Sequence, residues 1–288
     1  MPITVIRTLD REFHIESPDA TTHRAVEFAR ASPEMPGRSL SMVDLGVEHA
    51  GAFYRLKIPG DALYEGTLTH IVHRLHRYLF RLTFEEAGRC PLLHAASIVI
   101  DGKRVLLSAD KGSGKSTLAL RLLGDGVQVE GDENVVVFGS EIIARPRTLR
   151  IKQASLALLP EFRDRVLAAP SLTDWNDTRI YSVSPVTADN IWEIRQGPVF
   201  AIVFLTANFG GRSVARPISV DEATRRALEQ SFLPDQDKAR SASRLRALVR
   251  SACCYEMSLG DWENARWHLK HIANRATIDA DGTGGIGA

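Results

Sequence analysis

The chain has few cysteines and lacks any mark of export or membrane insertion. Its 288 residues include three cysteines, Cys90, Cys253 and Cys254, and the adjacent pair fits neither a disulfide framework nor a zinc-ligand pattern. No apolar run approaches the roughly 18 residues that a membrane span needs. The first residues also lack the charged and apolar segments of a signal peptide. We therefore expect a cytoplasmic protein with no membrane partner.

An excess of charge of either sign is also missing. Lys and Arg total 36 and Asp and Glu total 35, so the formal net charge is +1. Such a balance gives no general attraction to nucleic acid, and we expect no nucleic-acid partner. With 44% hydrophobic residues, the chain has enough apolar surface for one large domain or two modest ones.

The hydrophobic pattern divides the chain into three parts. Residues 1–65 contain short alternating stretches, and apolar residues recur at helical spacing over 67–86. We therefore predict a small β-rich N-terminal region with a bridging helix over 1–88. A catalytic core is expected over 89–275, and a glycine-rich disordered tail over 276–288.

The core follows an alternating order that is typical of α/β proteins. An apolar strand precedes a glycine-rich loop, a helix opens directly after the loop, and two further strands follow. The expected elements are strands at 96–100, 104–108, 127–130, 134–138 and 199–205, and helices at 116–124, 220–229 and 239–251.

The glycine-rich loop carries the strongest motif in the chain. A phosphate cradle needs backbone N–H groups that turn inward, a cation for the β and γ phosphates and a hydroxyl for Mg²⁺. Ala109 replaces the first glycine of the usual pattern, and its small side chain is the least obstructive substitute. A glycine-rich turn without a ligand is the alternative, but the flanking strand and helix favour a P-loop for ATP or GTP. The predicted nucleotide-binding residues are Asp110, Lys111, Gly112, Ser113, Gly114, Lys115, Ser116 and Thr117.

Two acids follow the strand that comes after the P-loop helix. If this strand lies in a parallel sheet, its carboxyl end faces the phosphate cradle, together with Asp132 and Glu133. They are then candidates for Mg²⁺ binding and proton transfer, although acidic pairs in turns are often merely solvated. His94 lies in an apolar run before the first core strand, where a buried structural histidine is the usual alternative.

These landmarks together resemble the catalytic core of the HPr kinase/phosphorylase superfamily. The resemblance is carried by His94-Ala95-Ala96-Ser97, the P-loop, and Gly131-Asp132-Glu133, in matching order and spacing. More narrowly, it points to HPr kinase-like proteins found beside peptide-modification genes, including lasso-peptide precursor kinases. Residues before about 88 do not resemble the N-terminal domain of true HPr kinases, which argues against HPr as the substrate.

The resemblance also implies roles for individual residues. Asp132 is the expected general base, with Lys115 on the phosphates and His94 as a helper near the phosphates or the second acid. Ser116 and Glu133 are the expected metal ligands, and Asp132 is a further metal candidate. Glu133 stands where the family usually has Asp, which puts its reach to the metal in question.

Three weaker signals have ordinary alternatives. Glu193 lies in a Glu-Ile-Arg segment that echoes one in true HPr kinases, and it is retained as a further metal candidate. The basic group at 145–152 suits nucleotide phosphates or an acidic peptide, although exposed arginines usually have no such role. The histidines at 70, 73 and 76 are not spaced at i, i+4 and do not predict a metal site.

Three functional classes fit these residues. A kinase would transfer the γ-phosphate to a hydroxyl, foremost Ser or Thr of a peptide or small protein, or a hydroxyl of a small molecule. An ATPase or nucleotide-dependent switch would use the same cradle to drive a conformational change, and a noncatalytic adaptor would bind nucleotide structurally. Asp132 and His94 favour the kinase. The sequence leaves open the acceptor, the choice between ATP and GTP, a reverse phosphorylase activity and homo-oligomer formation.

Overall fold

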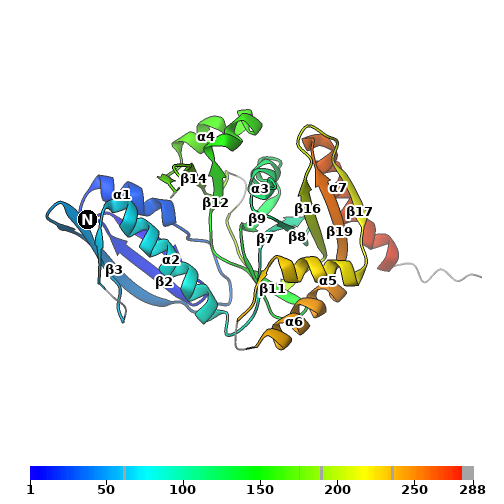
Figure 1. The fold of residues 1–288 in the computed structure, drawn as a ribbon, viewed down its shortest axis with the longest axis horizontal. Helices are drawn as coiled ribbons and strands as arrows, with labels where there is room; N and C mark the ends of the chain where they lie inside the picture. The colour runs from blue at the N-terminus through cyan, green and yellow to red at the C-terminus, as the bar shows by residue number, and fades with distance from the viewer. Residues whose placement is uncertain (61–62, 175, 189–190, 235–236, 281–288) are drawn as a thin grey trace, which may run out of the picture.

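The computed structural model describes residues 1–60, 63–174, 176–188, 191–234 and 237–280. Figure 1 shows an N-terminal lobe beside a mixed α/β core. Within the part of the chain that the structure describes, no helix is long and apolar enough to cross a membrane.

The N-terminal lobe is a five-stranded sheet in the order β1-β2-β3-β4-β5, accompanied by helices α1 and α2. Helix α2 begins after Thr67, whose hydroxyl accepts a hydrogen bond from the His70 N–H at 3.3 Å. The apolar side chains of α2 recur on one buried face and join the core of the lobe. The elements are β1 Ile3–Arg7, β2 Arg11–Glu16, α1 Ala20–Val26, the 3₁₀ turn η1 Glu27–Ala29, β3 Ser41–Ala50, β4 Phe53–Lys57, β5 Leu63–Gly66 and α2 Leu68–Glu86.

The core is built on a six-stranded sheet in the order β17-β19-β16-β8-β7-β9. Its strands are β7 Ala95–Ile100, β8 Lys103–Ala109, β9 Gln128–Gly131, β16 Ala201–Ala207, β17 Val214–Pro217 and β19 Cys253–Leu259. Val105 and Leu107 of β8 belong to one hydrophobic core and Leu106 to the other, because neighbouring side chains of a strand point to opposite faces. Helices α3 (Lys115–Gly124) and α7 (Trp262–Ala280) cover one face, and α5 (Val220–Glu229) and α6 (Lys238–Ser251) cover the other.

The sheet is mixed rather than parallel, which corrects the premise used to place Asp132 and Glu133. Strand β7 lies between β8 and β9 and is antiparallel to both. Two reversals of direction make β9 run the same way as β8. The carboxyl ends of β8 and β9 therefore lie at the same edge of the sheet. Asp132 and Glu133 thus follow a strand end beside the glycine-rich loop, as expected, although the sheet is not parallel.

Two small sheets connect this core to the N-terminal lobe. One has the order β15-β11-β10-β6-β18 and the other β12-β14-β13. Strand β12 runs beside α3, and α4 packs against β14 (Figure 1). The elements are β6 Leu92–Leu93, β10 Val135–Val137, β11 Glu141–Ala144, β12 Leu149–Lys152, the 3₁₀ turns η2 Gln153–Leu158 and η3 Pro160–Phe162, α4 Arg163–Ala168, β13 Ser171–Thr173, β14 Arg179–Val183, β15 Gly197–Pro198 and β18 Ser231–Phe232.

The C-terminal part of the chain contains more secondary structure than the sequence pattern predicts. Helix α5 spans Val220–Glu229, as predicted, but β19 and α7 were not predicted. Helix α7 continues to Ala280 and so includes residues 276–280 of the predicted disordered tail. Residues 281–288 of that tail lie outside the described residues.

Candidate functional site

The loop between β8 and α3 has the backbone conformation that its glycines permit. Gly112 and Gly114 both have φ of +93°, in the left-handed region that favours glycine. Gly114 is the N-cap of α3, and a Cβ atom there would lie 3.1 Å from the Leu259 side chain. Ser113 closes the turn by donating its hydroxyl hydrogen to the Asp110 carbonyl at 2.9 Å. Ala109 ends strand β8 and does not have a positive φ, so alanine is accommodated at this position without backbone strain.

A buried group of polar side chains lies directly beyond this loop. Lys115 is 6% exposed and Asp132 is 2% exposed. The Lys115 ammonium donates to Asp132 Oδ1 at 3.1 Å and to His94 Nε2 at 3.2 Å. The Ser116 hydroxyl donates to Asp132 Oδ2 at 2.5 Å. The structure therefore brings Lys115, Ser116, Asp132 and His94 into one network.

The protonation states of this network follow from burial and from the charge of Lys115. Burial raises the pKa of Asp132, but the Lys115 ammonium and the Ser116 hydroxyl outweigh it and leave this pKa below its usual value. Burial, with the nearby Lys115 charge, lowers the pKa of His94 from 6.5 to about 4. At neutral pH, Asp132 is thus a carboxylate and His94 is a neutral imidazole.

The position of Asp132 is fixed by the residues just before it. A Cβ atom on Gly131 would lie 2.8 Å from the Arg145 carbonyl oxygen, so only glycine allows this close backbone approach. Glu130 accepts two hydrogen bonds from the Arg104 guanidinium, each at 2.7 Å, and both side chains are almost fully buried. These contacts hold the end of β9 against the neighbouring segments.

Glu133 lies at the site but has another partner. Its backbone φ is +85°, an uncommon value for a residue other than glycine and one that costs conformational energy. The Glu133 carboxylate forms an ion pair with Arg147. The second acid of the pair therefore faces the basic group at 145–152, while Asp132 faces Ser116 and Lys115.

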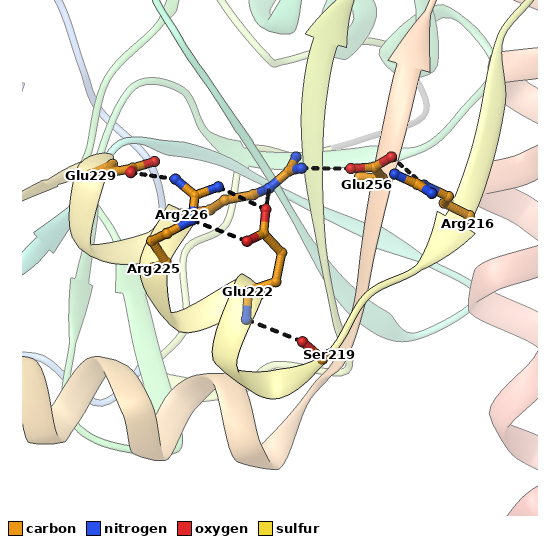
Figure 2. Close-up of polar contacts among 7 residues, drawn as sticks. All are labelled: Arg216, Ser219, Glu222, Arg225, Arg226, Glu229 and Glu256. Atoms are coloured by element: carbon orange, nitrogen blue, oxygen red, sulfur yellow. Dashed lines mark hydrogen bonds and ion pairs between the residues drawn. The ribbon is translucent and has the colours of Figure 1, made fainter.

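The end of α5 supports both His94 and the first loop residue. The backbone carbonyl of Gln230 accepts a hydrogen bond from the backbone N–H of His94 at 2.8 Å. The side-chain amide of Gln230 donates a hydrogen bond to the Asp110 carboxylate. Figure 2 shows the ion-pair network that ties α5 to the sheet: Arg226 donates to Glu222 of the same helix and to Glu256 of β19, each at 2.6 Å. This network orients the helix whose last turn contacts the site.

These side chains line a cavity of about 480 Å³. Its core side is formed by Asp110, Lys111, Gly112, Gly114, Lys115, Ser116, Thr117, His94, Asp132 and Glu133. The opposite side includes Phe28 of η1 and His73 and His76 of α2, so the N-terminal lobe completes the cavity. Arg147, Arg150 and Lys152 also line it, together with apolar side chains from η2, β13 and β14.

The sequence pattern did not assign the N-terminal residues to this site. His73 and His76 lie on the core-facing side of α2, and the three-residue spacing was the available signal for a shared helix face. Among the described residues, no group of three or more His, Cys, Asp or Glu side chains is placed to hold a metal ion. The α2 histidines thus form part of the cavity wall.

Glu193 is not brought to this cavity. Its carboxylate pairs with Arg195, and its backbone forms an isolated bridge with Glu34 of the N-terminal lobe. Glu193 is absent from the residues that line the cavity around Lys115.

Comparisons with solved structures find distant likenesses of the fold. No family model matches the chain, and no curated protein matches it. Among solved structures, the chain is similar to the HPr(Ser) kinase/phosphatase from Coxiella burnetii, with 14% sequence identity and a TM-score of 0.34, over 66% of this chain and 99% of that chain.

Proposed function

We propose that the protein is a kinase that transfers the γ-phosphate of ATP, or of GTP, to a hydroxyl group. This proposal rests on one observation: Lys115 and Ser116, which follow the glycine-rich loop, both donate hydrogen bonds to the buried carboxylate of Asp132. Phosphoryl transfer needs mainly positioning and charge neutralisation, and this group supplies a cation, a hydroxyl and a proton acceptor.

The loop is suited to bind the nucleotide phosphates. The N-terminus of α3 presents backbone N–H groups and the positive end of a helix dipole to an anion. Lys115 contacts the β and γ phosphates in this proposal, and its ammonium then leaves Asp132 Oδ1 free to accept a proton. Apolar side chains of Leu158, Leu172 and Ile180 line the same cavity and offer a surface for the base.

The oxygen atoms at the site also fit Mg²⁺. Ser116 provides a hydroxyl at the start of α3, and Mg²⁺ is commonly held through only one or two protein oxygen ligands and the substrate phosphates. When bound, the ion would neutralise charge that develops on the transferred phosphoryl group. Glu133 would join these ligands only after it separates from Arg147.

Asp132 is the proposed general base. Its low pKa keeps it ionised at neutral pH, so that it can accept the proton of the attacking hydroxyl. Neutral His94 accepts a hydrogen bond from Lys115 and so holds the ammonium in place without adding a second positive charge. The favoured acceptor is Ser or Thr of a peptide or small protein.

An ATPase or switch would use the same cradle, with Asp132 positioning water in place of an acceptor. The two functions are separated by incubating the protein with γ-labelled ATP, Mg²⁺ and the products of neighbouring genes, and then locating the label by mass spectrometry. We expect label on a Ser or Thr hydroxyl, and none with the Lys115→Ala variant. Release of labelled inorganic phosphate with no labelled acceptor would reject the kinase and favour the ATPase.

A further inference from the structure

A second cavity, of about 570 Å³, lies beside the first on the core-facing side of α2. Three arginines of α2, Arg74, Arg77 and Arg81, line it together with Arg147. Glu133 is the single carboxylate among the described residues that line this space. The remaining wall is largely aromatic, with Tyr64 of β5 and Tyr78, Phe80 and Phe84 of α2. We refer to this space as the α2 cavity.

The α2 cavity adjoins the nucleotide site through shared side chains. His76, Glu133 and Arg147 line both cavities, and we refer to these three side chains as the partition. Glu133 directly follows Asp132, the proposed base, and pairs with Arg147. A molecule held in the α2 cavity would therefore lie next to the group that accepts the hydroxyl proton.

The charge around the partition is not balanced within the described residues. Glu133 faces Arg147, and Arg74 and Arg77 of α2 add further positive charge to the same wall. Arg81 pairs with Glu85 of the same helix. The buried atoms His76 Nε2, Arg147 Nε and Glu133 Oε2 have no hydrogen-bond partner among the described residues. Buried polar atoms are normally paired, so these unpaired atoms leave room at the partition for a ligand that accepts hydrogen bonds from the nitrogens.

Burial and the surrounding guanidinium groups also act on His76. Burial, followed in size by the charges of Arg147, Arg150 and Arg145, lowers the pKa of His76 well below its usual value. His76 is therefore neutral at physiological pH and can offer one N–H group. An oxyanion is the ligand that would satisfy this N–H group and the arginines together.

We propose that the α2 cavity binds a carboxylate or phosphate group of the acceptor and so selects anionic acceptors. This inference rests on the proposed kinase function and names the substrate class for it. Guanidinium groups bind both oxyanions in a bidentate manner, and the aromatic rings provide contact area for the rest of the molecule. The acceptor hydroxyl would then point past the partition toward Asp132.

The test measures binding and transfer separately with defined probes. The peptides have one Ser flanked by Glu, by Gln or by Lys, at equal length, and glycerol 3-phosphate with glycerol forms the small-molecule arm. Binding is measured with Mg²⁺ and a nonhydrolysable ATP analogue, and transfer with γ-labelled ATP. We expect the Glu-flanked peptide or glycerol 3-phosphate to bind at least about tenfold more tightly than its neutral counterpart, because hydrogen bonds to charged groups are stronger than those to neutral groups.

Two variants assign the preference to the α2 cavity. Arg74→Gln/Arg77→Gln should remove most of the preference for the anionic probe while nucleotide affinity stays within about twofold, since neither residue lines the nucleotide cavity. Arg77 is exposed, so Arg77→Glu should fold normally and should shift the preference toward the Lys-flanked peptide. Arg246→Gln, at an exposed arginine of α6, is the matched control and should change neither measurement.

The outcomes separate the two proposals. Equal binding of anionic and neutral probes, or an anion preference that survives in the Arg74→Gln/Arg77→Gln variant, overturns the assignment of the α2 cavity. Equal labelling of anionic and neutral acceptors also overturns it, while the kinase function stands. Tight anion binding that depends on Arg74 and Arg77, with ATP hydrolysis and no labelled acceptor, supports the anion site and rejects the kinase function.

Discussion

The two walls of the cavity around Lys115 handle buried charge differently. On the core wall, formed by the glycine-rich loop, His94 and Asp132, the buried Lys115 ammonium faces the buried Asp132 carboxylate at 3.1 Å. The basic wall comes from segment 145–152, in which Arg147 pairs with Glu133 and Arg145 packs over the Phe80 ring, and burial lowers the pKa of each of these two arginines to about 10. The core wall is internally paired, whereas the basic wall would gain from an anion.

Removing Lys115 should have the largest effect. Lys115→Ala should weaken Mg-nucleotide binding by on the order of 100-fold, since truncating one partner of a buried charge pair costs about 2–5 kcal/mol. The same change leaves Asp132 buried without its cation, so the variant should also be less stable by about 3–5 kcal/mol. Calorimetry for binding and thermal unfolding for stability check the two effects.

A double variant separates these consequences. Lys115→Ala/Asp132→Asn should recover stability, because no uncompensated carboxylate remains, but it should not recover nucleotide binding. Unchanged nucleotide affinity in a folded Lys115→Ala variant would contradict the assignment of the core wall.

The contact between the two walls should be sensitive to a single methyl group. Gly131→Ala would place its Cβ atom 2.8 Å from the Arg145 carbonyl oxygen, a backbone atom that cannot move alone. We expect a loss of about 1–3 kcal/mol in the free energy of unfolding, as for other overpacked sites. Chemical denaturation measures the loss. Gly139→Ala serves as the comparison, because Gly139 has no atom within 4 Å of an added Cβ and its substitution reports only the cost of a positive φ. An unaffected Gly131→Ala variant would show that the walls are not packed as described.

Removing a buried cation from the basic wall should leave stability unchanged or raise it, whereas removing Lys115 should lower it. Arg145 is 5% exposed, and its Nη1 atom has no hydrogen-bond partner among the described residues. Arg145→Met retains much of the side-chain volume over Phe80 and removes the buried charge. The unfolding temperature should therefore stay equal or rise, in contrast to Lys115→Ala. A clear fall would mean that the Arg145 charge is compensated in the free protein.

The smallest expected effect is a shift in one histidine pKa. His94 has a pKa of about 4 because of burial and Lys115, whereas the pKa of His76 is lowered by burial and the arginines of the basic wall. Neither imidazole should titrate between about pH 6 and pH 8 in NMR spectra. Lys115→Ala should raise the pKa of His94 and leave that of His76 unchanged. A shift of both would show that the Lys115 charge acts on His76 as well as on His94.

The contrast between the walls also explains what the sequence could predict. The loop at 109–117 is local in the chain, and the two left-handed glycines and the helix start are encoded within nine positions. The sequence also predicted that Asp132 lies near the loop. Strand β7 separates β8 from β9, but it is antiparallel to both, so β8 and β9 run in the same direction and end at the same edge of the sheet.

The rest of the site depends on contacts between distant segments. Phe28, His73 and His76 reach the cavity only because the N-terminal lobe packs beside the core, and no local pattern records that packing. The ion pair between Glu133 and Arg147 likewise joins two segments across a turn and removes Glu133 from the side of Ser116. Strand β19 was missed because its sequence, Cys253–Leu259, mixes polar and apolar residues without a clear strand signal.

If Asp132 is the base of a kinase, the Asp132→Asn variant should separate nucleotide binding from phosphoryl transfer. The change keeps the shape of the side chain and removes its proton acceptor. We predict Mg-ATP affinity within a few-fold of wild type and a transfer rate reduced by about 10²–10⁴-fold, the usual contribution of a positioned acid–base group. Full transfer activity would contradict the account, and loss of Mg-ATP binding together with transfer would assign Asp132 to the metal instead.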